Sequence, residues 1–351
     1  MNDRITVCGA GGFIGGHLIS SFKQAGISPL RAIDIKPFNQ WFQLFDDVEN
    51  LQLDLRDHGA ARTAVTHSRY VYNFAADMGG MGFIENNKAL CMLNVLINTH
   101  LLMASREAGV SRFFFASSAC VYPANKQTNP NVSPLKEADA YPAMPEDGYG
   151  WEKLFSERMC RHFEEDFGLT TRVARYHNVY GPLGTWNDGR EKAPAAICRK
   201  VIEAKLSGRN EIVVWGSGEQ TRSFQFIEDA IYGTQLIMHG DCSDPINLGS
   251  SELVSIDQLV DIVEEIAGVK LHRLYDPRAP KGVNGRNSDN TLIKKLFSWE
   301  PSIKLRVGLE KTYSWIYDQM VSSGDAKSTN PSLGGPRVLH GKTRLLRSAL
   351  E

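Results

Sequence analysis

Four side chains that can move protons follow one another in a single stretch of this chain. The apolar run Phe113-Phe114-Phe115 predicts a buried strand, which delivers Ser118 and Cys120 at its carboxyl end. Tyr149 and Lys153 are four residues apart at the start of a helical pattern, so they lie on one helix face. In an open α/β sheet, ligands bind outside the carboxyl ends of the strands. A hydroxyl, a thiol, a phenol and an ammonium group would therefore meet there, which predicts a proton-transfer site.

The spacing of Tyr149 and Lys153 suggests how such a site works. An ammonium group beside a phenol favours the phenolate, so we expect Lys153 to lower the pKa of Tyr149 from about 10. Ser118 can donate a second hydrogen bond to the same reacting oxygen. The alternative is an ordinary pair on a helix surface. A second Tyr-x-x-x-Lys pair, Tyr122 and Lys126, is rejected because Pro123 and the polar loop around it disfavour a helix.

A dinucleotide-binding pattern occupies the N-terminus. A short β-rich run, RITVC, leads directly into GAGGFIG and then into a helical pattern. Glycines let the backbone approach a pyrophosphate, which the free N–H groups and the dipole of a helix N-terminus hold. The residues expected to hold the diphosphate of this cofactor are Gly9, Gly12, Phe13, Ile14 and Gly15.

Three further residues are expected around the cofactor. Asp34 ends the next strand, where it would bind ribose hydroxyls and repel the extra phosphate of NADP, so NAD is the expected cofactor. Asp54 follows a third strand and either faces the adenine or caps the helix expected over 57–66. Ala75 lies in a run of small residues after a fourth strand, which permits close approach of the cofactor.

The order of these patterns predicts the fold class, α/β. Strands and helices alternate as they do in a doubly wound, Rossmann-type parallel sheet, and the 85–108 segment predicts one long helix. We expect residues 1–178 to form an NAD-binding domain to which 219–249 return. Residues 179–218 and 250–321 would form a smaller mixed α/β substrate-binding lobe, and 322–351 a flexible tail.

Composition excludes several classes of function. The 351 residues carry 39 Lys plus Arg and 40 Asp plus Glu, so the net charge of −1 predicts no nucleic-acid partner. Six scattered cysteines without a C-x-x-C pair predict no metal site and no disulfide framework, and favour a cytoplasmic location. No signal peptide and no membrane span are expected, because the first strand begins at once and no apolar run is long enough.

Together, the glycine turn, Ser118 and the Tyr149/Lys153 pair resemble the extended short-chain dehydrogenase/reductase family, which includes the NAD-dependent epimerases and dehydratases. The resemblance implies that Tyr149 takes a hydroxyl proton while NAD⁺ accepts a hydride from the same carbon. It also implies that Lys153 holds the nicotinamide ribose.

Five further motifs narrow the resemblance to nucleotide-sugar epimerases that act on GDP-mannose at sugar carbons 3 and 5. The motifs are DMGGMGF at 77–83, SSAC at 117–120, REKAPAA at 190–196, QTRSF at 220–224 and GRNSDN at 285–290. The implied reaction yields GDP-L-galactose or GDP-L-gulose through transient oxidation at carbon 4. The resemblance makes Cys120 the base and Lys192 the acid. Otherwise Cys120 would be a small buried hydrophobic residue and Lys192 a solvated helix-start lysine.

The resemblance also supplies a substrate-binding set. It implies that Asn178, Lys200, Arg222 and Arg286 lie on the diphosphate side, with Glu191, Trp215 and Gln220 nearby. This set comprises Met78, Gly79, Ser118, Asn178, Glu191, Lys192, Lys200, Trp215, Gln220, Arg222 and Arg286. Surface charge is the alternative for Lys200.

Two other functions stay open at this point. A GDP-fucose-synthase type of epimerase-reductase also has a Ser and a Cys at this strand end, but it uses NADP, which Asp34 disfavours. A non-catalytic NAD(H)-sensing protein is the second alternative, although such proteins tend to lose the Tyr or the Lys. In the family, two helices from each subunit form a homodimer interface, and the 85–108 and 149–167 segments carry suitable apolar faces.

Overall fold

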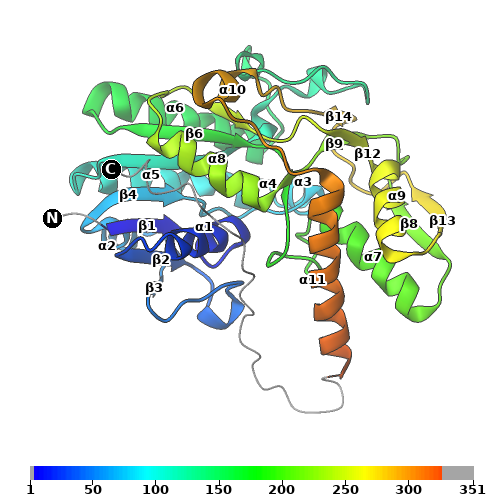
Figure 1. The fold of residues 1–351 in the computed structure, drawn as a ribbon. Coiled ribbons are helices and arrows are strands. Elements are labelled where there is room, and N and C mark those ends of the chain that lie inside the picture. The colour runs from blue at the N-terminus through cyan, green and yellow to red at the C-terminus, as the bar shows by residue number, and fades with distance from the viewer. Residues whose placement is uncertain (1–3, 326–351) are drawn as a thin grey trace.

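A seven-stranded parallel sheet organises the chain, and the computed structural model describes it within residues 4–325 (Figure 1). The strand order is β11-β6-β5-β4-β1-β2-β3, and every neighbouring pair is parallel. The strands are β1 (Arg4–Cys8), β2 (Leu30–Asp34), β3 (Glu49–Gln52), β4 (Ser68–Asn73), β5 (Arg112–Ser118), β6 (Thr171–Tyr176) and β11 (Ile246–Leu248). The predicted doubly wound α/β fold is confirmed.

The strand order reverses beside β1. The chain first builds β2 and β3 on one side of β1 and then crosses to β4 on the other. Crevices at such a switch point, outside the carboxyl ends of the strands, are where doubly wound sheets bind ligands. The glycine turn after β1 and the loop after β4 therefore share one binding edge.

Helices cover both faces of the sheet. On one face α2 (His58–Val65), α5 (Asn94–Glu107) and α6 (Tyr149–Phe167) pack side by side, and on the other α1 (Phe13–Gln24) packs against α8 (Ile227–His239) (Figure 1). Because both faces are covered, successive residues of a central strand are all buried, as Phe113, Phe114 and Phe115 are.

The prediction of one continuous helix over 85–108 is wrong. The segment forms three helices, α3 (Met81–Asn86), α4 (Lys88–Met92) and α5. Asn87 interrupts the path with φ −132°, and its side-chain amide donates to the Phe83 carbonyl at 2.9 Å. Within the described residues, Lys88–Glu107 is the one helical stretch long and apolar enough to cross a membrane. Of this stretch, 44% is buried, and its α5 packs on α2 and α6.

A smaller lobe stands beside the sheet. Its β8 (Glu211–Trp215) pairs in parallel with β13 (His272–Asp276), against α7 (Ala193–Ser207) and α9 (Ile256–Ala267). A three-stranded sheet joins the lobe to the large sheet, with β9 (Thr221–Ser223) between β12 (Leu253–Ser255) and β14 (Gly285–Arg286). The remaining elements are β7 (Val179–Tyr180), β10 (Gln225–Phe226), α10 (Thr291–Phe297) and α11 (Leu305–Asp325). The exact domain boundaries stay a prediction.

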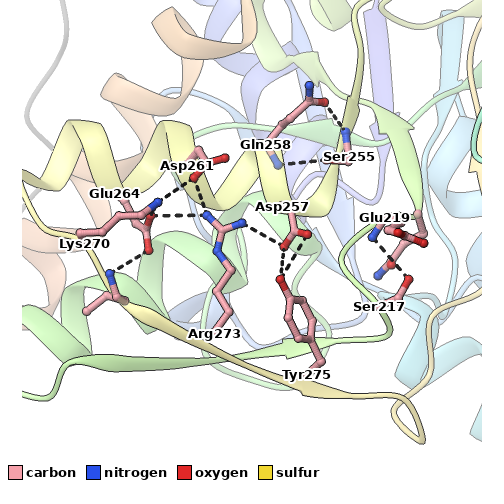
Figure 2. A network of polar contacts seen from close by, with 12 residues as sticks. Ser217, Glu219, Ser255, Asp257, Gln258, Asp261, Glu264, Lys270, Arg273 and Tyr275 are labelled. Carbon is pink, nitrogen blue, oxygen red and sulfur yellow. Dashed lines mark hydrogen bonds and ion pairs between the residues drawn. The ribbon is translucent and has the colours of Figure 1, made fainter.

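Charged side chains connect α9 to β13 in this lobe (Figure 2). The Arg273 guanidinium reaches Asp257 at 3.0 Å and Asp261 at 2.5 Å, both on α9. The Tyr275 hydroxyl donates to Asp257 at 3.1 Å. Arg273 crosslinks two turns of the helix to the strand, so the network fixes the orientation of the β8–β13 pair.

The final helix runs further than the sequence indicates. The predicted tail begins at 322, but α11 continues to Asp325. The rest of the predicted tail, 326–351, lies outside the described residues.

Candidate active site

Ser118 and Cys120 sit at the carboxyl end of β5. The short 3-10 turn η2 (Ala119–Val121) begins directly after Ser118, whose hydroxyl accepts a hydrogen bond from the Cys120 N–H at 3.2 Å. The N-terminus of α6 is pressed against this turn, because a Cβ at Gly150 would clash with the Cys120 carbonyl oxygen. Tyr149 and Cys120 consequently share one buried cluster.

Tyr149 and Lys153 lie on one face of α6, as predicted. The Lys153 Nζ is 5.4 Å from the centre of the Tyr149 ring and 3.7 Å from Glu152 Oε2. Burial raises the pKa of Tyr149 well above its ordinary value of 10, with smaller contributions from Cys120 and Glu152, while the Ser118 hydroxyl acts in the opposite direction. The expected lowering of this pKa is therefore wrong for the protein by itself, because burial outweighs a lysine whose charge is balanced by Glu152.

The Cys120 thiol faces a buried arginine. Arg286 Nη1 lies 3.7 Å from Cys120 Sγ, its Nε donates to Gln127 Oε1 at 2.6 Å, and its Nη2 pairs with Glu146. The predicted contact of Arg286 with a diphosphate stays a prediction, since all three arms of this guanidinium meet protein groups here.

Burial acts in opposite directions on the predicted acid and base. It raises the pKa of Cys120 to about 11, further helped by Glu146 and opposed by Arg286. It lowers the pKa of Lys192, the residue preceding α7, and the negative charge of Cys120 opposes that shift. Cys120, Lys192 and Arg286 thus lie within electrostatic reach of one another. The pKa of the thiol is therefore further from neutral pH than the sequence indicates, and the pKa of the lysine is closer to it.

The glycine turn after β1 has the geometry of a dinucleotide site. Gly9 adopts φ +82°, and a Cβ there would lie 2.8 Å from the backbone of Phe74 and Ala75. A Cβ at Gly15 would clash with the Gly9 carbonyl oxygen. Gly12 precedes α1, whose first turn has no side-chain cap and no acidic residue, so the N–H groups at Phe13 and Ile14 remain available for a phosphate. These features fit the diphosphate of NAD.

The two carboxylates predicted near the cofactor differ in their surroundings. Asp34 is buried at the end of β2, accepts a hydrogen bond from the Lys36 N–H at 3.0 Å, and has a pKa raised by burial. Asp54 instead forms a two-pronged ion pair with Arg56. The alternative of Asp54 as a helix cap is wrong, because Asp57 caps α2 by accepting from Ala60 N–H at 2.7 Å.

Most predicted nucleotide-binding groups gather where β8, β9 and α7 meet. The Lys200 ammonium lies 5.4 Å from the Trp215 ring centre and donates to the Val213 carbonyl at 2.8 Å. The Gln220 side chain donates to the Trp215 carbonyl at 2.6 Å, and its buried Oε1 has no partner. Burial, then repulsion from Arg286, lowers the pKa of Arg222 to about 10.

Three predicted residues have structural contacts of their own. The Asn178 amide donates to the Ser223 carbonyl at 3.1 Å, which ties the end of β6 to β9. Glu191 pairs with Arg199 at 3.1 Å, on the first half of α7. Met78 packs against the Cys120 cluster.

The loop containing Met78 is fixed against the segment before α7. A Cβ at Gly79 would lie 2.8 Å from Phe83 and 3.1 Å from Arg190, so this backbone tolerates only glycine. Arg190 reaches Asp77 at 3.3 Å and stacks 4.0 Å from the Phe83 ring centre. These contacts bring the segment carrying Lys192 against the loop that follows β4.

Sequence reasoning missed three residues of the site: Trp41, Gln127 and Glu146. The Trp41 ring covers Gly11, where a Cβ would lie 2.7 Å from the indole. Gln127 and Glu146 hold Arg286 from two different loops. Only Glu146 carried a local signal, since it stands three residues before Tyr149.

A doubly wound sheet with this glycine turn and this Ser-Tyr-Lys group has the architecture of a dinucleotide-binding enzyme of the dehydrogenase/reductase type. The sequence pattern of the NAD dependent epimerase/dehydratase family matches residues 5–249, and the chain belongs to that family. Its cofactor is NAD.

Particular relatives are closely similar. GDP-mannose 3,5-epimerase 1 of Oryza sativa subsp. indica is 45% identical over 318 residues, 90% of this chain and 82% of the relative. GDP-mannose 3,5-epimerase of Arabidopsis thaliana is 42% identical over 335 residues, 95% and 87% of the two chains. The UDP-glucose 4-epimerase of Thermotoga maritima shares the fold, with a TM-score of 0.81 at 23% identity over 90% of this chain and 99% of that one.

Proposed function

We propose that this protein epimerises GDP-D-mannose at sugar carbons 3 and 5, giving GDP-L-galactose, GDP-L-gulose or both, through transient oxidation at carbon 4. The observation that carries the proposal is the grouping of Cys120 and Lys192 beside the Ser118, Tyr149 and Lys153 group, in a chain 45% identical to a GDP-mannose 3,5-epimerase. Oxidation at carbon 4 needs only the Ser118, Tyr149 and Lys153 group. Inversion at carbons 3 and 5 additionally needs a proton acceptor and a proton donor there, which a buried thiol and a buried amine can supply.

NAD, when bound, accepts and returns the hydride of carbon 4. The residues that would hold it are Gly9, Gly12, Phe13, Ile14, Gly15, Asp34, Asp54, Ala75, Tyr149 and Lys153. The buried Asp34 carboxylate disfavours the extra phosphate of NADP, which argues against the GDP-fucose-synthase alternative.

Tyr149 and Ser118 handle the hydroxyl at carbon 4. Tyr149 moves the hydroxyl proton, and Ser118, whose Oγ neighbours the same turn, hydrogen-bonds the oxygen. Lys153 lies on the Tyr149 face of the helix and supplies positive charge when the phenolate forms. The high pKa of the buried phenol makes Tyr149 a strong proton acceptor once ionised, but one that depends on this nearby charge.

Cys120 and Lys192 act at the neighbouring carbons. A ketone at carbon 4 makes the hydrogens on carbons 3 and 5 acidic, because the carbanion delocalises into the carbonyl. Inversion needs one group to remove a proton and another to return one from the opposite face. Cys120 is proposed as the base and Lys192 as the acid, and burial raises the pKa of Cys120 to about 11 and lowers the pKa of Lys192.

The nucleotide is proposed to bind along the smaller lobe. Arg222, Arg286, Asn178 and Lys200 supply groups for the diphosphate, and Arg is suited to phosphate oxygens because it donates in parallel pairs. Trp215, half exposed at the end of β8, offers an aromatic face, and the unpaired Gln220 Oε1 offers an acceptor. Met78, Gly79 and Glu191 border the sugar.

The test is proton exchange measured by NMR. GDP-mannose incubated with the protein in heavy water, without added cofactor, should gain deuterium at sugar carbons 3 and 5 while new GDP-hexose signals form. Cys120→Ala and Lys192→Ala should abolish the exchange, whereas Cys242→Ala, a half-buried cysteine remote from Tyr149 in sequence, should retain it. Protein that holds NAD but gives neither exchange nor product would refute the proposal.

We also propose a homodimer in the cytoplasm. Large apolar side chains remain exposed on the neighbouring helices α4, α5 and α6, namely Met92, Leu93, Leu96, Met103, Trp151 and Phe155. A contiguous apolar face of this kind is typical of a subunit interface. Phe155→Glu should convert a dimer to a monomer in light scattering, and a wild-type monomer would refute the assembly. Six free cysteines agree with a reducing compartment.

A further inference from the structure

A buried ion pair stands directly beside the Cys120 thiol. Arg286, on β14, sends Nη1 to the sulfur at 3.7 Å and Nη2 to a carboxylate oxygen of Glu146. Glu146 lies in the loop before α6, and its backbone N–H donates to the Cys120 carbonyl at 3.0 Å. Glu146 is therefore linked to Cys120 by a backbone hydrogen bond and, through its side chain, by the arginine that both groups contact.

The second carboxylate oxygen of Glu146 has no partner. Oε2 is fully buried and accepts no hydrogen bond, and the Glu146 side chain is 11% exposed. A buried oxygen without a partner destabilises the fold, so its retention calls for a reason other than stability. The Glu146 carboxylate acts on the Cys120 thiol both as a negative charge and as a hydrogen-bond acceptor.

Among the charges around the sulfur, that of Glu146 has the largest effect on the pKa of Cys120, second only to burial. Tyr149, Lys192, Arg222 and Cys91 face the same cluster, and none of them is a carboxylate. Arg286 favours the thiolate, and Glu146 neutralises Arg286 and adds a negative charge of its own.

We propose that Glu146 is a positioning residue of this active site, which holds Arg286 against Cys120 and keeps the proton on the sulfur until the sugar is in place. Its carboxylate offsets the arginine charge that would otherwise ionise the thiol. Cys120 is thereby kept as a thiol between turnovers, which also protects it from oxidation, because the thiolate is the reactive form.

The test is the titration of Cys120 in the holoenzyme. The absorbance near 240 nm of each protein, minus that of the matching Cys120→Ser protein, reports the thiolate as the pH is raised. Glu146→Gln keeps the size of the side chain and removes its charge, so the midpoint should fall by about one pH unit or more, a tenfold rise in thiolate at a fixed pH. Asp147→Asn, the adjacent exposed carboxylate that pairs with Lys88, should leave the midpoint unchanged.

A second variant keeps the test decisive if Glu146→Gln folds poorly. Arg286→Gln leaves the Glu146 charge facing the sulfur alone, so the midpoint should rise. An unchanged or higher midpoint in Glu146→Gln, or an unchanged or lower one in Arg286→Gln, would overturn the proposal.

The positioning role of Glu146 rests on the proposed function, because it presupposes that Cys120 is catalytic. The titration itself measures only the protonation of Cys120 and requires no turnover. If Cys120 is the base, Glu146→Gln should also shift the acid limb of the epimerisation pH profile to lower pH by the same amount. A shifted thiol midpoint with an unshifted profile would support the role of Glu146 and refute Cys120 as the base.

Discussion

Glu157→Gln tests how the catalytic face of α6 is held in place. Glu157 lies on the same helix face as Tyr149 and Lys153, about two turns after Tyr149 and one turn after Lys153. Its carboxylate accepts from Ser117 Oγ at 2.5 Å, on β5, and pairs with Arg175 at 2.7 Å, on β6. One buried carboxylate thus fixes the helix against the two strands that end at the site.

The cost of the substitution follows from burial. The Arg175 side chain is 3% exposed and that of Glu157 is 2%, so a glutamine would leave a buried guanidinium without its counter-charge. Removing one partner of a buried pair costs about 3–5 kcal/mol. Unfolding in urea should show this loss as a lower midpoint with an unchanged slope.

The same helix supplies the control. Glu165→Gln breaks the exposed pair of Arg161 and Glu165, whose side chains are 55% and 46% exposed, and should cost far less stability because solvent screens this pair. We also expect Glu157→Gln to lower kcat more than it raises KM, because Tyr149 shifts relative to Ser118. Equal stability losses in the two variants would refute the reasoning.

Three further predictions concern the cofactor turn and pH. Gly15→Ala should weaken NAD binding in calorimetry at least tenfold, since its Cβ would strike the Gly9 carbonyl, whereas Gly16→Ala, with 3.3 Å to its nearest neighbours, should weaken it far less. Asp34→Ser should reduce the ratio of NAD affinity to NADP affinity by about tenfold, because a carboxylate that repels the extra phosphate is removed. The dissociation constants of both cofactors measure this ratio. Burial lowers the pKa of His177 to about 3, so its contribution to stability is complete above the unfolded value of 6.5 and is lost as the pH falls toward 3. That loss reaches about 2.7 kcal/mol by pH 4.5. In His177→Gln, the free energy of unfolding measured in urea should therefore fall less steeply as the pH is lowered.

Local patterns predicted the sheet and the site elements well, because each of these elements is determined by residues that are close together in the sequence. The apolar run at Phe113, the glycine turn after Cys8 and the helix that starts at Tyr149 all occur where expected. In the rejected pair, Tyr122 follows the 3-10 turn η2 and Lys126 ends the 3-10 turn η3 (Ala124–Lys126), so the two share no α-helix, as Pro123 indicated.

Contacts between distant segments were not predictable from such patterns. The strand His272–Asp276 has no clear alternation and forms because β8 offers it an edge. Glu146, Gln127 and Arg286 meet only because two loops converge on strand β14. The direction of the Tyr149 pKa shift was missed for the same reason, since burial is set by the tertiary fold rather than by the Tyr-Lys spacing.

The opposite shifts at Cys120 and Lys192 have one cause and one chemical consequence. Burial penalises whichever form is charged, so it raises the pKa of an acid that becomes an anion and lowers that of a base that becomes a cation. The pKa of the thiol rises to about 11 and that of the amine falls below its ordinary 10.5. The thiolate, once formed, is therefore a stronger base than a free cysteine, and the ammonium is a stronger acid than a free lysine, which suits the removal and the return of a carbon-bound proton. A single pocket shielded from water therefore equips both members of the proposed pair.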